Sequence, residues 1–204
     1  MNFFNKFLKR KFREKGFSTP KEEAESLMLL ALRSAYNIFR DRKFRKIINF
    51  EKQDEEEQNR LFNELAVTAV VLLKMILEDD IPRIPLKRRE FWQEVDSQLI
   101  KHFHSWLGDI GIPDRYLKIW KKLFQLRINE FKENEGEARH VWLEELLASQ
   151  NEALNDATVR VGAISVSAWM HLRRQKPPEN DKLRDYAKNW IISLNNQLAK
   201  RIGW

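Results

Sequence analysis

The residues best suited to metal or acid–base chemistry are the four histidines, His102, His104, His140 and His171. Glu137 and His140 have the Glu-x-x-His spacing of carboxylate-bridged di-iron bundles, but such sites need a second copy and further glutamates on facing helices. The second copy is missing from the sequence. Two residues apart on a helix, the imidazoles of His102 and His104 project about 200° apart and are not expected to share a metal. We therefore expect no metal and no cofactor.

The other common catalytic patterns are also missing. The sequence has no cysteine, no glycine-rich phosphate loop and no nucleophile elbow, so we expect no catalytic residue and no enzyme. A small helical enzyme with an apolar pocket is the alternative, and a deep cavity lined by several carboxylates would favour it. The lack of cysteine also fits a reducing, intracellular location rather than secretion.

Helical spacing of apolar residues recurs along the 204-residue chain, of which 43% is hydrophobic. We expect an all-α protein, with one helical domain over residues 18–204 and a basic segment over residues 1–17. Apart from "VGAISVSAW" at 161–169, no stretch alternates like a strand. About eight helices are expected, near residues 2–15, 20–40, 54–79, 88–107, 114–133, 136–148, 150–174 and 181–201.

The longest apolar run, residues 65–77, is interrupted by Thr68 and Lys74. It is shorter than the roughly 20 residues that a helix needs to cross a bilayer. We therefore expect no membrane-spanning segment.

The N-terminus carries much of the net charge of +7, because residues 1–15 contain six cations and one glutamate. Aromatic and leucine residues recur there at helical spacing, which predicts a basic amphipathic helix for an anionic membrane surface. Two alternatives are that the apolar stripe packs on the protein's own core, or that the segment contacts RNA or the ribosome. The residues expected to bind the anionic partner are Phe3, Phe4, Lys6, Phe7, Leu8, Lys9, Arg10, Lys11, Phe12 and Arg13.

Two glycines and a proline crowd into "GDIGIP" at residues 108–113, which predicts a tight corner between two helices. On the helix after the corner, apolar residues are expected to cover one broad side and lysines the other. Arg127 falls within the apolar side, where it needs a carboxylate partner or must reach the rim; Glu64 is the expected partner. The apolar side comprises Tyr116, Leu117, Ile119, Trp120, Leu123, Phe124, Leu126, Ile128 and Phe131, and the basic face includes Lys118, Lys121 and Lys122.

Residues 30–132, which include the corner and the helix after it, resemble the ubiquinol-cytochrome c chaperone family. Members of that family carry an Arg-Glu-x-Gly-Val-x-Asp corner followed by a Phe-Tyr-Gly-Arg-x-x-x-Tyr segment, and a Gly-Arg-Phe element upstream. This chain differs in having Thr68 in place of a histidine, and Gln125 and Leu126 in place of Tyr-Gly. The matching residues are Arg60, Phe62, Asp109, Gly111, Asp114, Phe124, Arg127 and Phe131.

The resemblance implies a non-enzymatic assembly factor that receives newly made cytochrome b during assembly of respiratory complex III. Such a factor would lie at the cytoplasmic face of the inner membrane, or on the matrix side in mitochondria, close to the ribosome. The expected partners are a membrane-protein client such as cytochrome b, an anionic membrane surface and the ribosome; DNA is not expected. The alternative from another class is a basic helical module that binds RNA through its arm and basic face.

Overall fold

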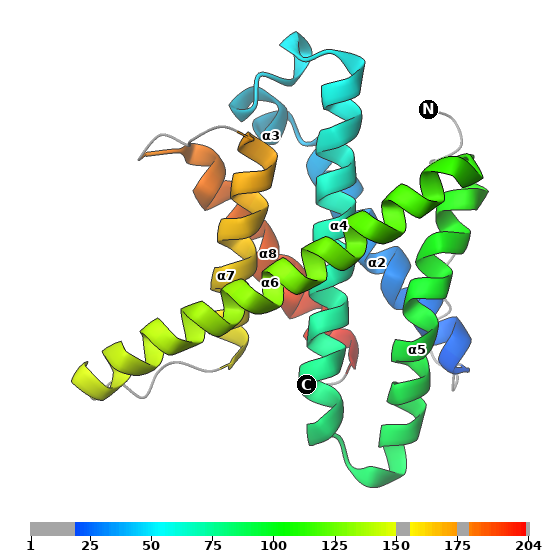
Figure 1. Ribbon diagram of the computed structural model, residues 1–204, viewed down its shortest axis with the longest axis vertical. Coiled ribbons are helices and arrows are strands. Elements are labelled where there is room, and N and C mark those ends of the chain that lie inside the picture. The colour runs from blue at the N-terminus through cyan, green and yellow to red at the C-terminus, as the bar shows by residue number, and fades with distance from the viewer. Residues whose placement is uncertain (1–18, 150–155, 175–179, 203–204) are drawn as a thin grey trace.

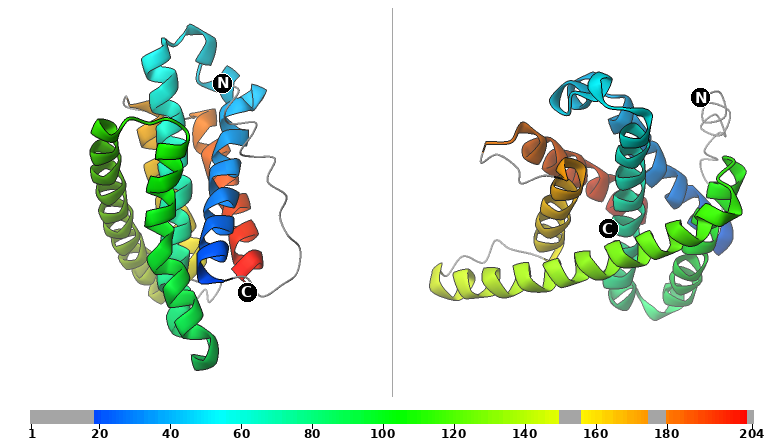
Figure 2. Two further views of the ribbon diagram at one scale, coloured as in Figure 1. Left: turned by 90° about the vertical axis from the view of Figure 1, so that its right-hand side faces the viewer. Right: turned by 45° about the horizontal axis from the view of Figure 1, so that its top comes forward.

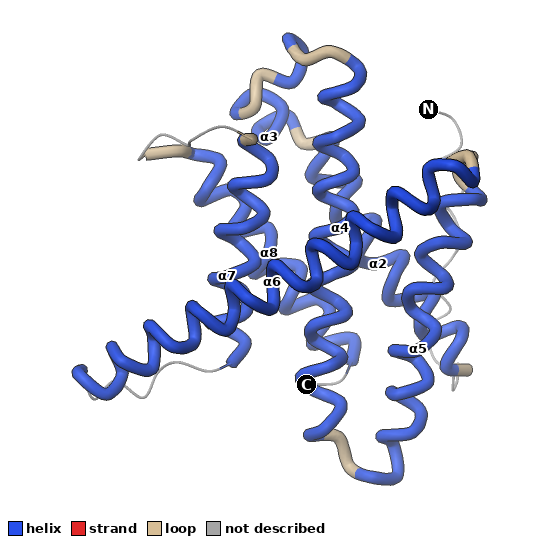
Figure 3. Tube along the Cα trace, in the orientation of Figure 1, coloured by secondary structure: helices blue, strands red, loops and turns tan. Residues whose placement is uncertain are grey.

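The computed structural model describes residues 19–149, 156–174 and 180–202, and within these ranges the side chains of 137–149 and 156–157 are not described. The described residues are 91% helical and contain no strand (Figure 3), which confirms the all-α prediction. The stretch 161–169 is helical. The elements are α2 (Pro20–Arg40), α3 (Arg42–Ile47), η1 (Phe50–Lys52), α4 (Glu55–Asp80), η2 (Ile81–Arg83), α5 (Leu86–Asp109), α6 (Asp114–Ser149), α7 (Asp156–Arg173) and α8 (Lys182–Ile202).

The helices form three layers (Figure 2, left). The outer layer is α6, which crosses the molecule diagonally in Figure 1. Behind it run α4, α5 and α7, and the far layer contains α2 and α8. The C-terminal end of α6 extends beyond α7 (Figure 1).

The central helix is α4, which contacts α2, α5, α6, α7 and α8. A helix that is apolar all round must be covered on every side, and the run 65–77 meets this requirement because all its residues except Lys74 are buried. The run is therefore the centre of the core. Within the described residues no helix has the length and apolar character needed to cross a membrane.

Capping residues fix the starts of α2 and α4. The Thr19 side chain accepts from the Glu22 N–H at 3.3 Å, and the Glu22 carboxylate accepts from the Thr19 N–H at 3.0 Å. This reciprocal capping box satisfies two backbone donors that a helix start leaves unpaired. Asp54 likewise caps α4 by accepting from the Glu57 N–H at 2.8 Å.

Two expectations about the helices were wrong. The ranges 114–133 and 136–148 form one continuous helix, α6, because a single glycine such as Gly136 weakens a helix by only about 1 kcal/mol. Asn134 also holds this part of α6 by donating to the Ser167 hydroxyl of α7 at 2.6 Å. The short helix α3 was not predicted; Asp41 caps it and Phe44 anchors it in the core.

Seven α-helices are present in the described residues, against about eight expected. The predicted amphipathic helix at residues 2–15, with its proposed anion-binding residues, lies outside the described residues.

The corner between α5 and α6 forms as predicted. Gly111 has a positive φ of 86°, a conformation that glycine adopts without a steric penalty. The Ile112 N–H donates to the Leu107 carbonyl at 3.0 Å and closes the end of α5. This bond pattern resembles a glycine-terminated helix end.

Candidate binding surfaces

Arg127 lies where α6 crosses α4. Its Nε and Nη2 donate to the two carboxylate oxygens of Glu64 at 3.1 and 2.8 Å, and its Nη1 donates to Glu130 at 3.1 Å. The predicted Glu64 partner is confirmed. Burial opposes the charged form, but the hydrogen bonds and charge of Glu64, with Glu130, raise the pKa of Arg127. The side chain is 15% exposed, so this pair is a largely buried tie between α4 and α6 rather than a surface pair.

The same polar network reaches α7. Glu130 contacts His171 Nε2 at 2.5 Å, and the backbone carbonyl of His171 accepts from Arg60 Nη1 at 2.7 Å. Arg60 also donates to the Leu172 carbonyl at 3.2 Å and is paired with Glu57. Arg60 thus satisfies carbonyls at the C-terminal end of α7. Two of the family-like residues, Arg60 and Arg127, therefore act together to join three helices.

The remaining family-like residues do not meet at this network. Asp109 and Asp114 are exposed at the corner, next to Gly111. About 13 residues of helix separate this corner from Arg127, which corresponds to about 20 Å. The three aromatic members contribute to packing: Phe124 and Phe131 are buried, and Phe62 is half-buried with its ring 5.3 Å from that of Phe39.

A cleft of about 420 Å³ lies between α4, α5 and α6. Ile100, Phe124 and Ile128 supply its apolar lining, and Glu78 is its one carboxylate. Lysines occupy much of the rest, and Glu78 pairs with Lys74 at 3.0 Å and with Lys132 at 2.6 Å. The full lining is Lys74, Glu78, Ile100, His104, Lys121, Phe124, Gln125, Ile128, Asn129 and Lys132.

The two histidines of α5 face different neighbours, as predicted. His104 lines the cleft close to Lys121, whereas His102 lies near Glu25 and Lys21 of α2. Burial lowers the pKa of both side chains. Both Nε2 atoms are buried and make no hydrogen bond with the described residues. Two imidazoles on opposite sides of a helix do not form a shared metal site. Glu137 and His140 lie outside the described side chains.

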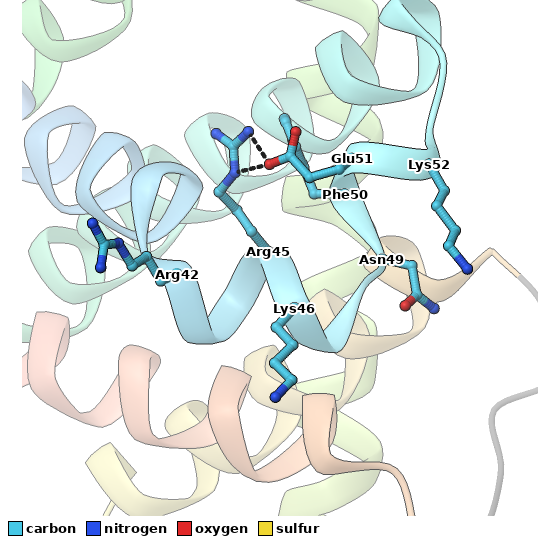
Figure 4. Close-up of a pocket in the computed structure, with 7 residues that line it drawn as sticks. All are labelled: Arg42, Arg45, Lys46, Asn49, Phe50, Glu51 and Lys52. Atoms are coloured by element: carbon cyan, nitrogen blue, oxygen red, sulfur yellow. Dashed lines mark hydrogen bonds and ion pairs between the residues drawn. The ribbon is translucent and has the colours of Figure 1, made fainter.

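A basic corner, which we define as residues 40–52, lies on α3 and η1. It contains six cations and two carboxylates. Seven of its residues line a surface hollow of about 350 Å³ (Figure 4). Arg45 lies 3.9 Å from the centre of the buried Phe50 ring and pairs with Glu51 at 2.5 Å. Figure 4 shows Arg42, Lys46 and Lys52 at well-separated places, with Lys46 and Lys52 pointing to the same side and Arg42 to another. This spread suits an extended anionic surface better than one small anion.

The outer part of α6 departs from the predicted division into an apolar and a basic side. Lys118, Lys121 and Lys122 are exposed, as expected for a basic face. Three residues assigned to the buried apolar side are instead exposed: Tyr116 by 43%, Ile119 by 59% and Leu126 by 62%. The packed side is narrower than predicted: Trp120, Phe124, Ile128 and Phe131 are buried, and Leu117 and Leu123 are half-buried against the core.

Comparison with known proteins adds no assignment, because no protein-family model, curated protein or solved structure matches this chain. The resemblance to the ubiquinol-cytochrome c chaperone family therefore stays a prediction.

The basic corner and the exposed apolar residues of α6, Tyr116, Ile119 and Leu126, were missed as functional candidates. The corner has a clear sequence signal, since five cations fall within the seven residues Arg40–Lys46. The exposed apolar residues of α6 have no such sequence signal, because their spacing is also that of a buried helix face.

Proposed function

We propose that this protein is a non-enzymatic assembly factor that binds a membrane-protein client while held at an anionic membrane surface. The observation that carries the proposal is the basic corner at 40–52, a second concentration of cations besides the N-terminal segment. Cations near an anionic bilayer contribute about 1 kcal/mol each to binding. The choice of client, a protein such as newly made cytochrome b, rests on the sequence resemblance, as does a location at the inner membrane.

Vesicle sedimentation tests the membrane part. The double variant Arg42→Glu/Lys46→Glu should bind anionic vesicles more than tenfold more weakly than the wild type, because it removes two cations and adds two anions. Neutral vesicles should bind both proteins alike, and more weakly than anionic vesicles bind the wild type. The control is Lys101→Glu/Lys200→Glu, which makes the same change of charge at exposed positions on α5 and α8. Equal binding by both double variants, or wild type that ignores anionic vesicles, would refute the membrane role of the corner.

The role of the N-terminal segment in membrane binding, predicted from its sequence, is tested separately. Its phenylalanines should give a salt-resistant part of vesicle binding, because insertion of apolar rings is not screened by ions. Phe4→Ser/Phe7→Ser should therefore weaken binding more at high salt than at low salt. Equal sedimentation of this variant and the wild type at high salt would contradict the anchoring role.

The client part is tested by co-purification of the chain from its own cells under conditions that preserve membrane complexes. Recovery of cytochrome b supports the proposal. Recovery of ribosomes alone supports the second candidate function, an RNA-binding module.

The second candidate is favoured by the same corner, because its aromatic residues Phe44 and Phe50 are buried and its exposed side chains are mainly cations, which can contact phosphates. Such contacts give a steep loss of affinity with salt. This alternative would be established if the logarithm of the RNA affinity fell linearly with the logarithm of the salt concentration and the chain bound no vesicles.

A further inference from the structure

One face of α6 changes character along its length. Ile119, Leu123, Leu126, Glu130 and Asn134 follow one another at spacings of three or four residues, so they lie in one row along the helix. Glu130 contacts His171 of α7, and Asn134 contacts Ser167 of the same helix. The earlier residues of the row lie beyond these contacts, and Ile119 and Leu126 are more than half exposed. The C-terminal part of the row is a helix-packing face, and its N-terminal part is open.

We propose that the open part of this row, with Tyr116, binds an acidic amphipathic helix of the client protein. We call it the open face of α6 and define it as Tyr116, Ile119, Leu123 and Leu126, of which Leu123 is half-buried against the core and the other three are exposed. The partner helix would continue along α6 the packing that α7 makes further on. This inference rests on the proposed function, because it supposes a protein client.

The charges around the open face select an acidic partner. Arg115 and Lys122 lie along one edge of it, and Lys118 lies further round the same side of the helix. All three are exposed, and none pairs with a carboxylate in the described part of the chain. The Arg115 guanidinium lies over the Tyr116 ring at 4.8 Å, and this ring can be shared with a partner. Complementary charges around an apolar centre favour the matching partner and disfavour others.

The same charges disfavour two other occupants. The N-terminal segment has a net charge of +5 over residues 1–15, so docking it here would bring like charges together. A second copy of the chain would place the same cations against each other across a two-fold interface.

A helix fits the open face better than a lipid surface does, because the row that contains it already packs against a helix. Its four apolar residues have the 3–4–3 spacing of a helix-packing seam. From Tyr116 to Leu126 the seam extends about 15 Å. Three turns of a partner helix, with apolar residues at the same spacing, match this length.

A synthetic helix of about 18 residues is the probe, with leucines at 3–4–3 spacing and glutamates beside them. Its labelled form is titrated with the full chain and followed by fluorescence anisotropy. The comparison peptide carries lysines in place of the glutamates. We expect saturable binding of the acidic peptide, at least about tenfold tighter than that of the lysine peptide.

Ile119→Ser/Leu126→Ser should weaken binding of the acidic peptide at least about tenfold, since both anchors are lost. Folding is checked by the thermal unfolding midpoint of each variant. The matched control is Leu86→Ser, which changes a leucine that is 75% exposed at the start of α5. This control should bind like the wild type.

Each outcome decides between occupants. No saturable binding, equal binding of both peptides, or no effect of the double variant would overturn the inference. A dimer that the double variant abolishes, or vesicle binding that it abolishes, would assign the face to a second copy or to lipid and would also overturn it. A chain that binds the acidic peptide but no anionic vesicle contradicts the membrane part of the proposed function alone.

Discussion

The two parts of α6 share the same apolar periodicity, but one part is packed within the protein and the other is exposed. From Arg127 to Asn134 the helix is tied to α4 and α7 by charged and polar contacts. From Tyr116 to Leu126 it keeps its inner side packed but leaves Tyr116, Ile119 and Leu126 exposed. Amphipathic spacing shows that a helix face is suited to packing. Whether the face is packed depends on whether a neighbouring helix lies against it.

The C-terminal end of α7 is held in place by side-chain contacts. Asp181 accepts from Arg173, from the Trp169 Nε1 at 2.7 Å and from the Leu183 N–H at 3.0 Å, and so fixes the end of α7 to the start of α8. Arg60 binds carbonyls at the same end of α7. The helix therefore stops beside the middle of α6, and the N-terminal part of the row on α6 remains open.

The largest expected effect is at the closed part. Arg127→Ala should lower the free energy of unfolding by about 3 to 5 kcal/mol, because Glu64 would remain as a largely buried, unpaired charge. Chemical denaturation measures the loss. Arg115→Ala at the open part is the control and should cost about 0 to 1 kcal/mol.

Removing both charges separates the pair from its burial cost. The double variant Arg127→Met/Glu64→Leu should recover most of the stability lost in Arg127→Ala, since no unpaired charge is left. Near-native stability of Arg127→Ala would contradict the account and indicate that the arginine is solvent-exposed.

A smaller effect is expected at the end of α7. Asp181→Asn should lower the free energy of unfolding by about 1.5 to 3 kcal/mol at pH 7. The carboxylate accepts several hydrogen bonds, including those from the Arg173 guanidinium, and the neutral amide cannot replace them all. The Arg173 hydrogen bond, with those of Trp169 and Leu183, outweighs burial and holds the pKa of Asp181 well below its usual value.

The pH dependence of this effect has a defined sign. Because the pKa of Asp181 is lower in the folded state, the ionised carboxylate stabilises the fold above its unfolded-state pKa of about 4. This stabilisation is lost progressively as the pH falls below that value toward the folded-state pKa. The difference between wild type and Asp181→Asn should therefore shrink from about pH 5 downward. Asp185→Asn, at an exposed site on α8, serves as the control. A difference that stays constant down to pH 3 would show that the charge of Asp181 is not responsible.

The smallest effect is expected at the open face. Ile119→Ser/Leu126→Ser should change the free energy of unfolding by no more than about 0.5 to 1 kcal/mol, since exposed substitutions remove little packing. Phe131→Ala on the same helix should cost about 3 to 5 kcal/mol, because this ring is fully buried. Comparable losses at both places in denaturant titrations would mean that the open face is packed within the protein.

Local signals predicted much of the fold. The start of the helix predicted at 20–40 carries Thr19 and Pro20, and the corner carries Gly108, Gly111 and Pro113; both were predictable because capping and turn chemistry depend on nearby residues. The helix boundary near Gly136 was wrong because contacts to α7 outweigh the weak preference of glycine against helix. The short helix α3 was missed because its support is the burial of Phe44, a tertiary effect.

The candidate sites were less predictable. The Arg127–Glu64 pair was predicted because a cation on an apolar helix face requires a carboxylate nearby. The open face was not, since the exposure of Ile119 and Leu126 depends on which part of α6 the neighbouring helix α7 contacts. The cleft beside His104 was also missed, because its lining comes from three helices that are distant in sequence.

The most direct test is thiol labelling of single-cysteine variants, which is clean because the chain has no cysteine of its own. Ile119→Cys should react with a thiol reagent about as fast as Lys118→Cys, whereas Ile128→Cys, at a buried position, should react far more slowly. The acidic peptide should protect Ile119→Cys and leave Leu86→Cys unchanged. Slow labelling of Ile119→Cys in the free full-length chain would contradict the account, because the face would then be covered by the protein itself.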